Sequence, residues 1–224
     1  MPTRAERRDL TEAAIIAAGQ RLLAEGGAEA LTIRGVAREL DLVPSALYRY
    51  VTKREDLLDL LVQHAHADLA ATIQAAHDAV PRADLAARWR AFAYTLREWT
   101  LAHRHEWKLI QNTVLTQRDP RPDRHYALHV LLLHMAADAE AAGQVPEPLL
   151  DPARSAVPGL PALLQLAGVE VSEQTVLAGL AAWHLLDGAL YVELLNPIGM
   201  PGLTDAGPYY DAMVAATERL VLRH

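Results

Sequence analysis

The feature that most constrains the fold is the helical character of the whole chain. Alanine and leucine dominate the sequence, and no convincing run of alternating β-branched residues predicts a strand. Apolar residues make up 51% of the 224 positions, which is enough to form a sizeable core, and no internal repeat is evident. We therefore expect an all-α protein of about nine helices.

Capping residues and helix breakers indicate where these helices begin and end. The candidate N-terminal caps are Asp9 (with Glu12), Thr32, Thr52 (with Glu55) and Ser172. The expected helices cover residues 10–24, 33–40, 44–50, 53–79, 83–102, 105–115, 123–142, 173–195 and 209–222. Residues 144–171 contain five prolines, so we expect a loop there with at most one short helical turn near Leu163.

Two further features narrow the class of protein. The chain contains no cysteine, which excludes disulfides, thiolate zinc sites and cysteine nucleophiles. Residues 1–9 are charged and resemble no signal peptide, and the longest apolar stretches fall far short of a membrane span. We therefore expect a cytoplasmic protein with no membrane contact.

The net charge of −7 is distributed unevenly along the chain. Residues 1–54 carry nine of the 21 Lys and Arg and seven of the 28 acids, a net of +2, which leaves −9 for the remainder. Nucleic-acid binding depends on a local basic surface and not on the total charge. The asymmetry is modest, and it is compatible with DNA binding by the N-terminal part.

Three short helices near the N-terminus, the second and third joined by a tight turn at Asp41-Leu42, describe a helix-turn-helix. Small or aliphatic side chains should fill its interior: Val36, Ala37, Leu40, Leu42, Ala46, Leu47 and Val51. The residues that remain can read base edges and bind phosphates. This candidate DNA-binding set comprises Thr32, Arg34, Pro44, Ser45, Tyr48, Arg49, Tyr50, Lys53 and Arg54.

Residue chemistry favours DNA over the alternative, a small helical subdomain with exposed charges. Arginine can bind guanine through two hydrogen bonds, and tyrosine and proline can touch thymine methyl groups. Lys53 and Arg54 add charge to a helix N-terminus, where free N–H groups suit a phosphate. Tyr48 and Tyr50 beside Arg49 are difficult to explain as a merely solubilising surface.

The run from Ala46 to Leu57, which contains Leu47, Tyr48, Tyr50, Val51, Lys53 and Glu55, resembles the DNA-binding domain of TetR-family repressors. The likeness covers about residues 10–60. It implies an all-α homodimer with two recognition helices in successive major grooves and a variable ligand-binding domain. By position, Pro44, Ser45, Tyr48 and Arg49 would face bases, Arg34 would lie near DNA, and Tyr50 with Lys53 or Arg54 would meet phosphate.

Two positions depart from the family pattern. Asp41 stands where glycine is usual in the turn, but aspartate tolerates left-handed backbone geometry better than most residues. Val43 replaces a small polar cap, which weakens the start of the third helix. The operator sequence therefore cannot be predicted by analogy. We expect a DNA-binding domain over residues 1–55 and a ligand-binding and dimerisation domain over 56–224.

Most large aromatic residues fall in this second part of the chain. The candidate ligand-binding residues are Tyr94, Trp99, His103, Trp107, Trp183, Asp187 and Tyr191. The alternative is that the aromatic stripes fill an ordinary core. Asp187 lies on an apolar stripe with Trp183 and Leu190, where a carboxylate needs a partner, either an Arg or His of the chain or a ligand donor. Residues 181–194 are similar to a Trp-then-Gly segment in one group of TetR-family ligand domains.

Ten histidines raise the question of a metal site. His125 and His129 share a helix face, but no carboxylate stands at metal-motif spacing. No phosphate-binding glycine loop and no nucleophile elbow appear either. We therefore predict no metal, no cofactor and no enzymatic activity.

The last two long helices, near 173–195 and 209–222, are apolar on more than one face. Leu177, Ala181, Leu185, Gly188 and Val192 form a second stripe, which predicts either full burial in one subunit or a four-helix homodimer interface. The function we predict is a repressor that leaves its double-stranded DNA operator when an unknown small-molecule effector binds. The alternatives are a helical ligand-binding protein that does not act on DNA and a helical enzyme using Asp187 or Glu193 with a histidine.

Overall fold

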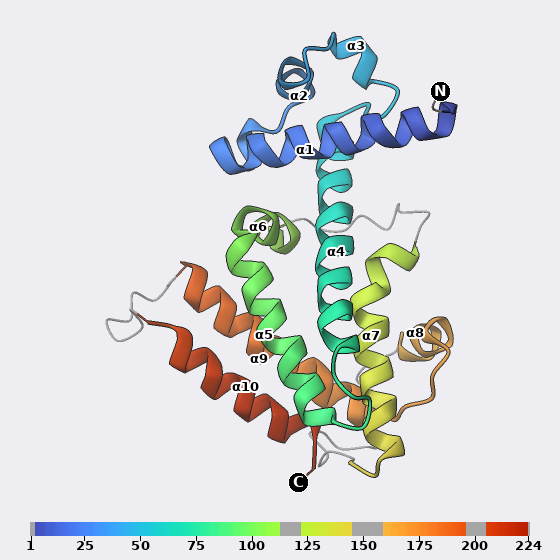
Figure 1. Cartoon of the computed structure of the whole chain (residues 1–224), viewed down its shortest axis with the longest axis vertical. Helices are drawn as coiled ribbons and strands as arrows, with labels where there is room; N and C mark the ends of the chain where they lie inside the picture. The colour runs from blue at the N-terminus through green and yellow to red at the C-terminus, as the bar shows by residue number, and fades with distance from the viewer. Residues whose placement is uncertain (1–2, 113–121, 145–158, 196–204, 224) are drawn as a thin grey trace. The chain divides into compact units, whose positions relative to one another are not determined.

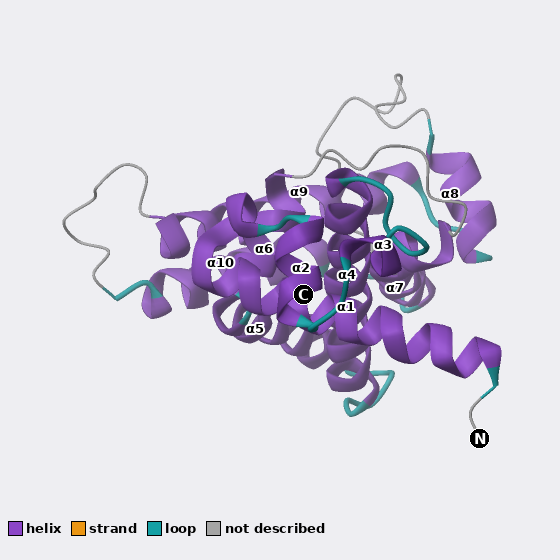
Figure 2. Cartoon of the chain, turned by 90° about the horizontal axis from the view of Figure 1, so that it is seen from above, coloured by secondary structure: helices purple, strands orange, loops and turns teal. Residues whose placement is uncertain are grey.

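The computed structural model describes residues 3–112, 122–144, 159–195 and 205–223. Within these ranges all regular structure is α-helical, and Figure 2 shows no strand among them. The all-α fold class is thereby confirmed. Ten helices are described where we expected about nine.

The described residues form the following helices, given in chain order. They are α1 (Arg4–Ala30), α2 (Ile33–Glu39), α3 (Pro44–Leu47), α4 (Arg54–Asp78), α5 (Leu85–Ala102), α6 (Arg104–Asn112), α7 (Pro122–Ala141), α8 (Leu160–Ala167), α9 (Glu173–Leu195) and α10 (Gly207–Val221).

The first helix begins earlier than predicted. The capping box is formed by Thr3 and Glu6, so the expected box at Asp9 and Glu12 is wrong, and those residues lie inside α1. The expected end near residue 24 is also early. Helical turns continue to Ala30 across Gly27, whose φ of 65° and ψ of −167° interrupt the helix. Glycine adopts this backbone conformation without the steric cost that a side chain would add.

The additional helix is α8, in a stretch where we expected at most one turn. Pro161 lies in the first turn, where the missing N–H costs no helical hydrogen bond, and Gly168 ends the helix with a left-handed φ of 65°. Leu160 and Ala167 are buried together with Leu133 of α7 and Val176 of α9. Tertiary burial therefore supports a helix that local sequence signals did not predict.

The chain separates into two compact units. The first comprises Met1–Asp68 and His103–His125, and the second comprises Leu69–Ala102 and Tyr126–His224. The first unit thus contains α6 and most of α4 in addition to the expected DNA-binding segment. Helix α4 is continuous from Arg54 to Asp78, and it therefore belongs to both units.

The first unit packs α1, α2, α3, α6 and the first part of α4 around one core (Figure 1). Ile15 and Ala18 of α1, Val36 of α2, Leu47 of α3 and Leu57 of α4 are fully buried in it. Outside this core, the Arg21 guanidinium donates to the Glu39 carboxylate at 2.7 Å and joins α1 to the end of α2. The helix-turn-helix is therefore held on a scaffold that contains the start of α4.

The second unit is organised around α5, which presents one apolar stripe to the core. Leu85, Trp89, Phe92, Leu96 and Trp99 are all buried. Helix α10 packs against both α5 and α9. The buried Tyr210 hydroxyl donates to the Ala93 carbonyl at 2.8 Å, and the Trp89 indole donates to Thr217 Oγ1 at 3.2 Å.

Helix α9 is unusually apolar for a helix of this unit. Among the described residues it alone is long and apolar enough to cross a membrane by length and composition, with a mean hydropathy of 1.3 over 18 residues. Core helices of soluble proteins pass the same test, so this is weak support for a membrane span. Only 39% of that window is buried, however.

Candidate nucleic-acid interface

The turn between α2 and α3 has the geometry that the sequence predicted. Asp41 adopts a left-handed φ of 53°. The Leu42 amide donates to the Ala37 carbonyl at 2.8 Å and the Asp41 amide to the Arg38 carbonyl at 3.2 Å. These two bonds resemble the pairing that ends many helices when glycine occupies the left-handed position. Aspartate replaces that glycine here without loss of the turn.

The start of α2 is fixed by its cap, as predicted. Thr32 Oγ1 accepts a hydrogen bond from the Gly35 amide at 2.9 Å. A Cβ at position 35 would lie 3.0 Å from that oxygen and 3.3 Å from the Ala30 carbonyl oxygen, so a side chain would crowd the cap. This arrangement leaves the Arg34 side chain exposed at the beginning of the helix.

Helix α3 is shorter than the predicted 44–50 and ends at Leu47. Val43 provides no side-chain cap, in agreement with the weak start expected there, and Pro44 occupies the first turn. The Tyr50 and Val51 amides both donate to the Leu47 carbonyl, at 2.8 and 3.0 Å, so residues 48–50 form a turn. Buried Leu47 and Val51 anchor this segment and leave the residues between them at the surface.

Most of the predicted DNA-binding set is exposed. The exposed members are Thr32, Arg34, Pro44, Ser45, Tyr48, Arg49 and Lys53. Tyr50, in contrast, is half-buried and packs against the core of the first unit. Leu42 was expected in the interior and is 41% exposed. Its backbone closes the turn, and the side chain projects from it.

Arg54 differs from the other basic residues because it is bound within the protein. Its guanidinium donates to the Leu31 carbonyl at 3.0 Å and to the Ala28 carbonyl at 2.5 Å, near the end of α1. Arginine near a helix C-terminus stabilises carbonyls that lack a helical partner. The structure thus assigns Arg54 a structural contact and leaves Lys53 as the exposed cation at the start of α4.

The start of α4 is capped by a different residue from the one expected. The Asp56 carboxylate, not Glu55, accepts from the Thr52 amide at 2.8 Å, from the Thr52 hydroxyl at 2.5 Å and from the Lys53 amide at 3.2 Å. The hydrogen bond from the Thr52 hydroxyl is the main reason why the pKa of Asp56 lies below its ordinary value. The segment that carries Lys53 is held in place by this carboxylate.

The predicted ligand-binding residues divide between the two compact units. His103 and Trp107 fall in the first unit, whereas the other five fall in the second. Tyr94 and Tyr191 are 36% and 50% exposed, and Trp99 is buried. Trp183 is half-buried, with its ring centroid 6.2 Å from that of Phe92. Their role in ligand binding stays a prediction.

Asp187, the carboxylate on the apolar stripe, is half-buried and makes a polar or charged contact within the chain. The two alternatives for its partner therefore stay open. Sequence reasoning did not single out Thr100, which follows Trp99 on α5. Its hydroxyl is fully buried and has no hydrogen-bond partner among the described residues.

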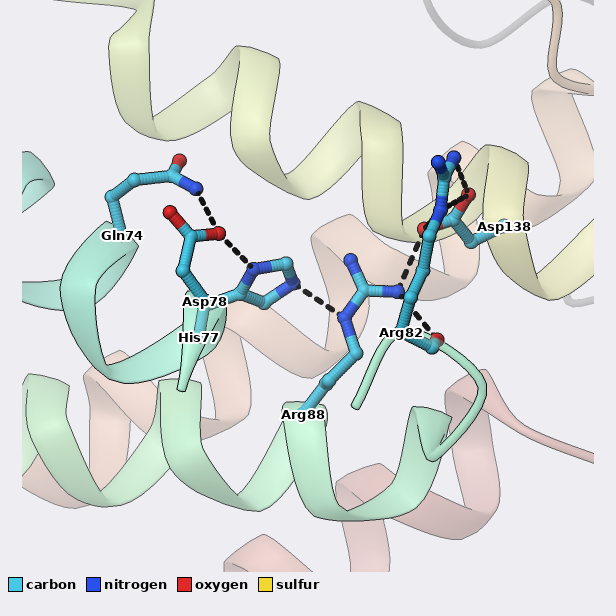
Figure 3. A network of polar contacts seen from close by, with 6 residues as sticks. All are labelled: Gln74, His77, Asp78, Arg82, Arg88 and Asp138. Atoms are coloured by element: carbon cyan, nitrogen blue, oxygen red, sulfur yellow. Dashed lines mark hydrogen bonds and ion pairs between the residues drawn. The ribbon is translucent and has the colours of Figure 1, made fainter. Parts of the chain in front are cut away.

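A second feature missed by sequence reasoning is a polar network at the end of α4 (Figure 3). Arg88 of α5 is buried and donates from Nε to His77 Nε2 at 2.8 Å. Its Nη1 donates to Asp138 of α7 at 2.7 Å and to the Arg82 carbonyl at 3.1 Å. The Arg82 guanidinium also donates to Asp138, at 2.6 Å. The network thereby joins α4, α5, α7 and the connection between α4 and α5.

This arrangement fixes the protonation state of His77. Arginine cannot accept a hydrogen bond, so His77 Nε2 must accept and the neutral ring carries its proton on Nδ1, 3.5 Å from Asp78. Burial, followed by the Arg88 cation, lowers the pKa of His77. Burial raises the pKa of Asp138, but hydrogen bonds from Arg82 and Arg88 outweigh it and place that pKa below its ordinary value.

The stability of the protein should consequently fall as the pH falls from about 7 to about 5. The unfolded chain protonates His77 near its ordinary pKa, whereas the folded protein resists protonation, so the unfolded state binds more protons in this window. One such group contributes at most about 1.4 kcal/mol per pH unit. The measurement is urea unfolding from pH 5 to 8.

The control for this pH dependence is His77→Gln, whose amide oxygen can still accept from Arg88. The variant should show a shallower loss of stability over the same range. An identical pH dependence in the variant and the wild type would assign the effect to other groups.

Together, the fold and the exposed helix-turn-helix define a helical DNA-binding regulator. Residues 15–61 match the family described as "Bacterial regulatory proteins, tetR family". Residues 89–217, more than half of the chain, match "Tetracyclin repressor-like, C-terminal domain". The protein therefore belongs to the TetR family, whose members are DNA-binding transcriptional regulators and not enzymes.

Relatives and solved structures agree with this membership. The HTH-type transcriptional regulators Rv1816 of Mycobacterium tuberculosis and Mb1846 of Mycobacterium bovis are each 28% identical, covering 99% of this chain and 96% of theirs. The crystal structure of regulatory protein SCO4313 is similar with a TM-score of 0.70 and 25% identity, covering 96% of this chain and 98% of that one. A tetR-family protein from Rhodococcus RHA1 shares the fold, with a TM-score of 0.60, 20% identity and coverage of 94% and 96%.

Proposed function

We propose that this regulator is a homodimeric repressor that binds its operator through α3 of each subunit and releases it when a small molecule binds the second unit. The observation that carries the proposal is the exposure of Pro44, Ser45, Tyr48 and Arg49 around one anchored helical turn. Base edges in the major groove offer hydrogen-bond acceptors and thymine methyl groups to such a set. Lys53 beside it would bind a phosphate and position the helix.

Dimerisation is supported by the apolar surface of α9. Leu185, Tyr191 and Leu195 are 46%, 50% and 44% exposed in the single subunit. Exposed apolar patches on a soluble regulator mark interaction sites. A second copy of the chain is the occupant we propose, because two half-sites of an operator require two recognition helices.

An exposed glycine on α9 supports a close helix–helix approach. A Cβ at Gly188, which is one turn from the exposed Leu185, would meet no atom within 4 Å. Glycine inside a helix costs about 1 kcal/mol relative to alanine, and no packing within the subunit explains this cost at position 188. Contact with a helix of the partner subunit would explain it, since small residues let two helices approach closely.

A response to ligand is supported by two features of the second unit. The first is Thr100, because a bound molecule near Trp99 would supply the partner that its buried hydroxyl lacks.

The second is α4, which begins at the DNA-binding segment and ends in the network of Figure 3. That network borders a groove of about 840 Å³ lined by His134 and Asp138 among others. If the protein has two conformations that differ in the placement of α4, an effector that binds one of them more tightly would increase the population of that conformation.

The test is operator binding by wild-type protein and by Leu185→Glu. The introduced carboxylate would be buried without a partner at the subunit interface, so we expect a monomer. Operator affinity should fall by more than about 100-fold, because a monomer engages only one half-site. Molecular mass by light scattering and fluorescence anisotropy with DNA from upstream of the coding region measure the two effects.

Leu166→Glu on α8 is the matched control, since it places the same charge on a leucine that is 50% exposed, close to the 46% of Leu185, on a different helix. It should stay dimeric and bind DNA like the wild type. A dimeric Leu185→Glu variant with full affinity would contradict the interface. Failure of the wild type to bind any DNA selected from a random pool would contradict the repressor itself and favour a ligand-binding protein that does not act on DNA.

A further inference from the structure

We propose that the first two turns of α1 form a second DNA contact, in which Arg7 and Arg8 bind the phosphate backbone that flanks each half-site. The inference rests on the operator binding proposed above and extends it to a segment outside the helix-turn-helix. These turns also precede residue 15, where the match to the TetR DNA-binding family begins.

The arginines continue the face of α1 that packs on the core. Residues seven and eleven apart share a helix face. Arg8 therefore lies on the face of Ile15 and Gly19, and Arg7 on the face of Ala18, and these three residues are buried. The face that contacts α2 and α4 from residue 15 onward is thus basic where it leaves the core. Asp9 lies on the opposite side of the helix.

Arg7 and Arg8 are exposed and have no hydrogen bond or ion pair from their side chains to any described residue. The neighbouring acid Glu6 is engaged in the cap, where its carboxylate accepts from the Thr3 amide at 2.6 Å. Two cations on one face are therefore available to an anion outside the chain.

Core packing does not explain why these turns are helical. Residues 6–10 are all exposed, and Leu10 is 65% exposed. Local capping supports the helix instead, through the reciprocal bonds of Thr3 and Glu6 at 2.6 and 3.2 Å. In both views the N-terminal end of α1 projects past α2, α3 and the start of α4 (Figures 1 and 2). These first turns of α1 are basic, capped and not packed on the core, so they are suited to binding a partner beside the DNA-binding unit.

DNA is the occupant that charge and position favour. Duplex DNA carries about one negative charge per 1.7 Å of its axis, so a helix that overhangs the recognition surface meets several phosphates. Contacts of this kind position the protein and add affinity without reading sequence. The acidic remainder of the chain, at −9, is the competing partner, and contact with it would affect assembly and not DNA affinity.

The test compares full-length wild type with Arg7→Gln/Arg8→Gln on the operator that the wild type binds, across about 50 to 300 mM salt. We expect at least about a tenfold loss of affinity and a slope of log K against log salt that is smaller by about 2 to 4, since each phosphate contact contributes about 0.9. Circular dichroism checks that the variant remains helical. Arg7→Lys/Arg8→Lys keeps the charges and should restore binding.

Two matched comparisons separate this contact from net charge. Arg104→Gln/Lys108→Gln removes two exposed cations from α6 of the same unit and should leave the salt slope unchanged. Trimming the DNA to the half-sites should weaken the wild type but not the Arg7/Arg8 variant. Wild-type affinity and slope in that variant, or a change in its dimer mass alone, would overturn the inference while leaving the repressor intact. Absence of wild-type binding would instead overturn the proposed function.

Discussion

Tyr48→Ala should weaken operator binding by about 100-fold while the dimer and the fold remain intact. Tyr48 is 51% exposed and follows directly after α3, beside Ser45 and Arg49. Loss of one contact at a protein–DNA interface costs about 1 to 3 kcal/mol. Each operator engages two copies of the residue, so a cost of about 1.5 kcal/mol per copy amounts to about 3 kcal/mol, which is about 100-fold in affinity. Fluorescence anisotropy at fixed salt measures the loss.

The structure also predicts what Tyr48→Ala leaves unchanged. Because the side chain lies outside the buried cluster of the first unit, unfolding stability should change by no more than about 0.5 kcal/mol. Tyr94→Ala, the same truncation at an exposed tyrosine of the second unit, should bind DNA like the wild type. Tyr48→Phe separates the ring from the hydroxyl. Undiminished binding by Tyr48→Ala would remove the residue from the interface, and loss of the dimer would give it a different role.

Features of the site that depend on neighbouring residues could be predicted from the sequence. The cap at Thr32, the left-handed turn at Asp41 and the burial of Leu47 and Val51 each follow from a local rule about capping, turn chemistry or helical spacing. Local rules failed where two residues competed for one role, as when Asp56 and not Glu55 capped α4.

Contacts between distant residues could not be predicted in this way. Arg54 reaches carbonyls 23 and 26 positions earlier, and Arg88 meets a carboxylate 50 positions later. Neither pairing leaves a periodic signal, and a single sequence gives no covariation from which to infer contacts. The same reason explains α8, which is stabilised by burial against α7 and α9. The sequence therefore predicts a phosphate ligand at Arg54, whereas the structure shows that its guanidinium binds two backbone carbonyls.

These long-range contacts occur at both ends of the helix that the two units share. Near its start, Arg54 ties α4 to the end of α1, and near its end His77 ties it to Arg88. A helix anchored at both ends can transmit a displacement only if one anchor has a second arrangement available. The network around Arg88 is such a candidate, because its histidine can gain a proton and its groove is open to small molecules.

Asp138→Asn should destabilise the protein by about 3 kcal/mol, because removing one partner of a buried ion pair leaves the other charge uncompensated. Arg88 is only 5% exposed, and Asp138 supplies its carboxylate partner. Arg88→Met should cost less, since Asp138 would keep its bond to Arg82, whose side chain is 82% exposed. The double variant should be no less stable than Asp138→Asn, because no buried cation would remain. Urea unfolding at pH 7.5 and one fixed protein concentration measures all three, with the exposed Asp9→Asn as the control. Additive losses in the double variant would show that the two residues act separately and would remove the network as an anchor of α4.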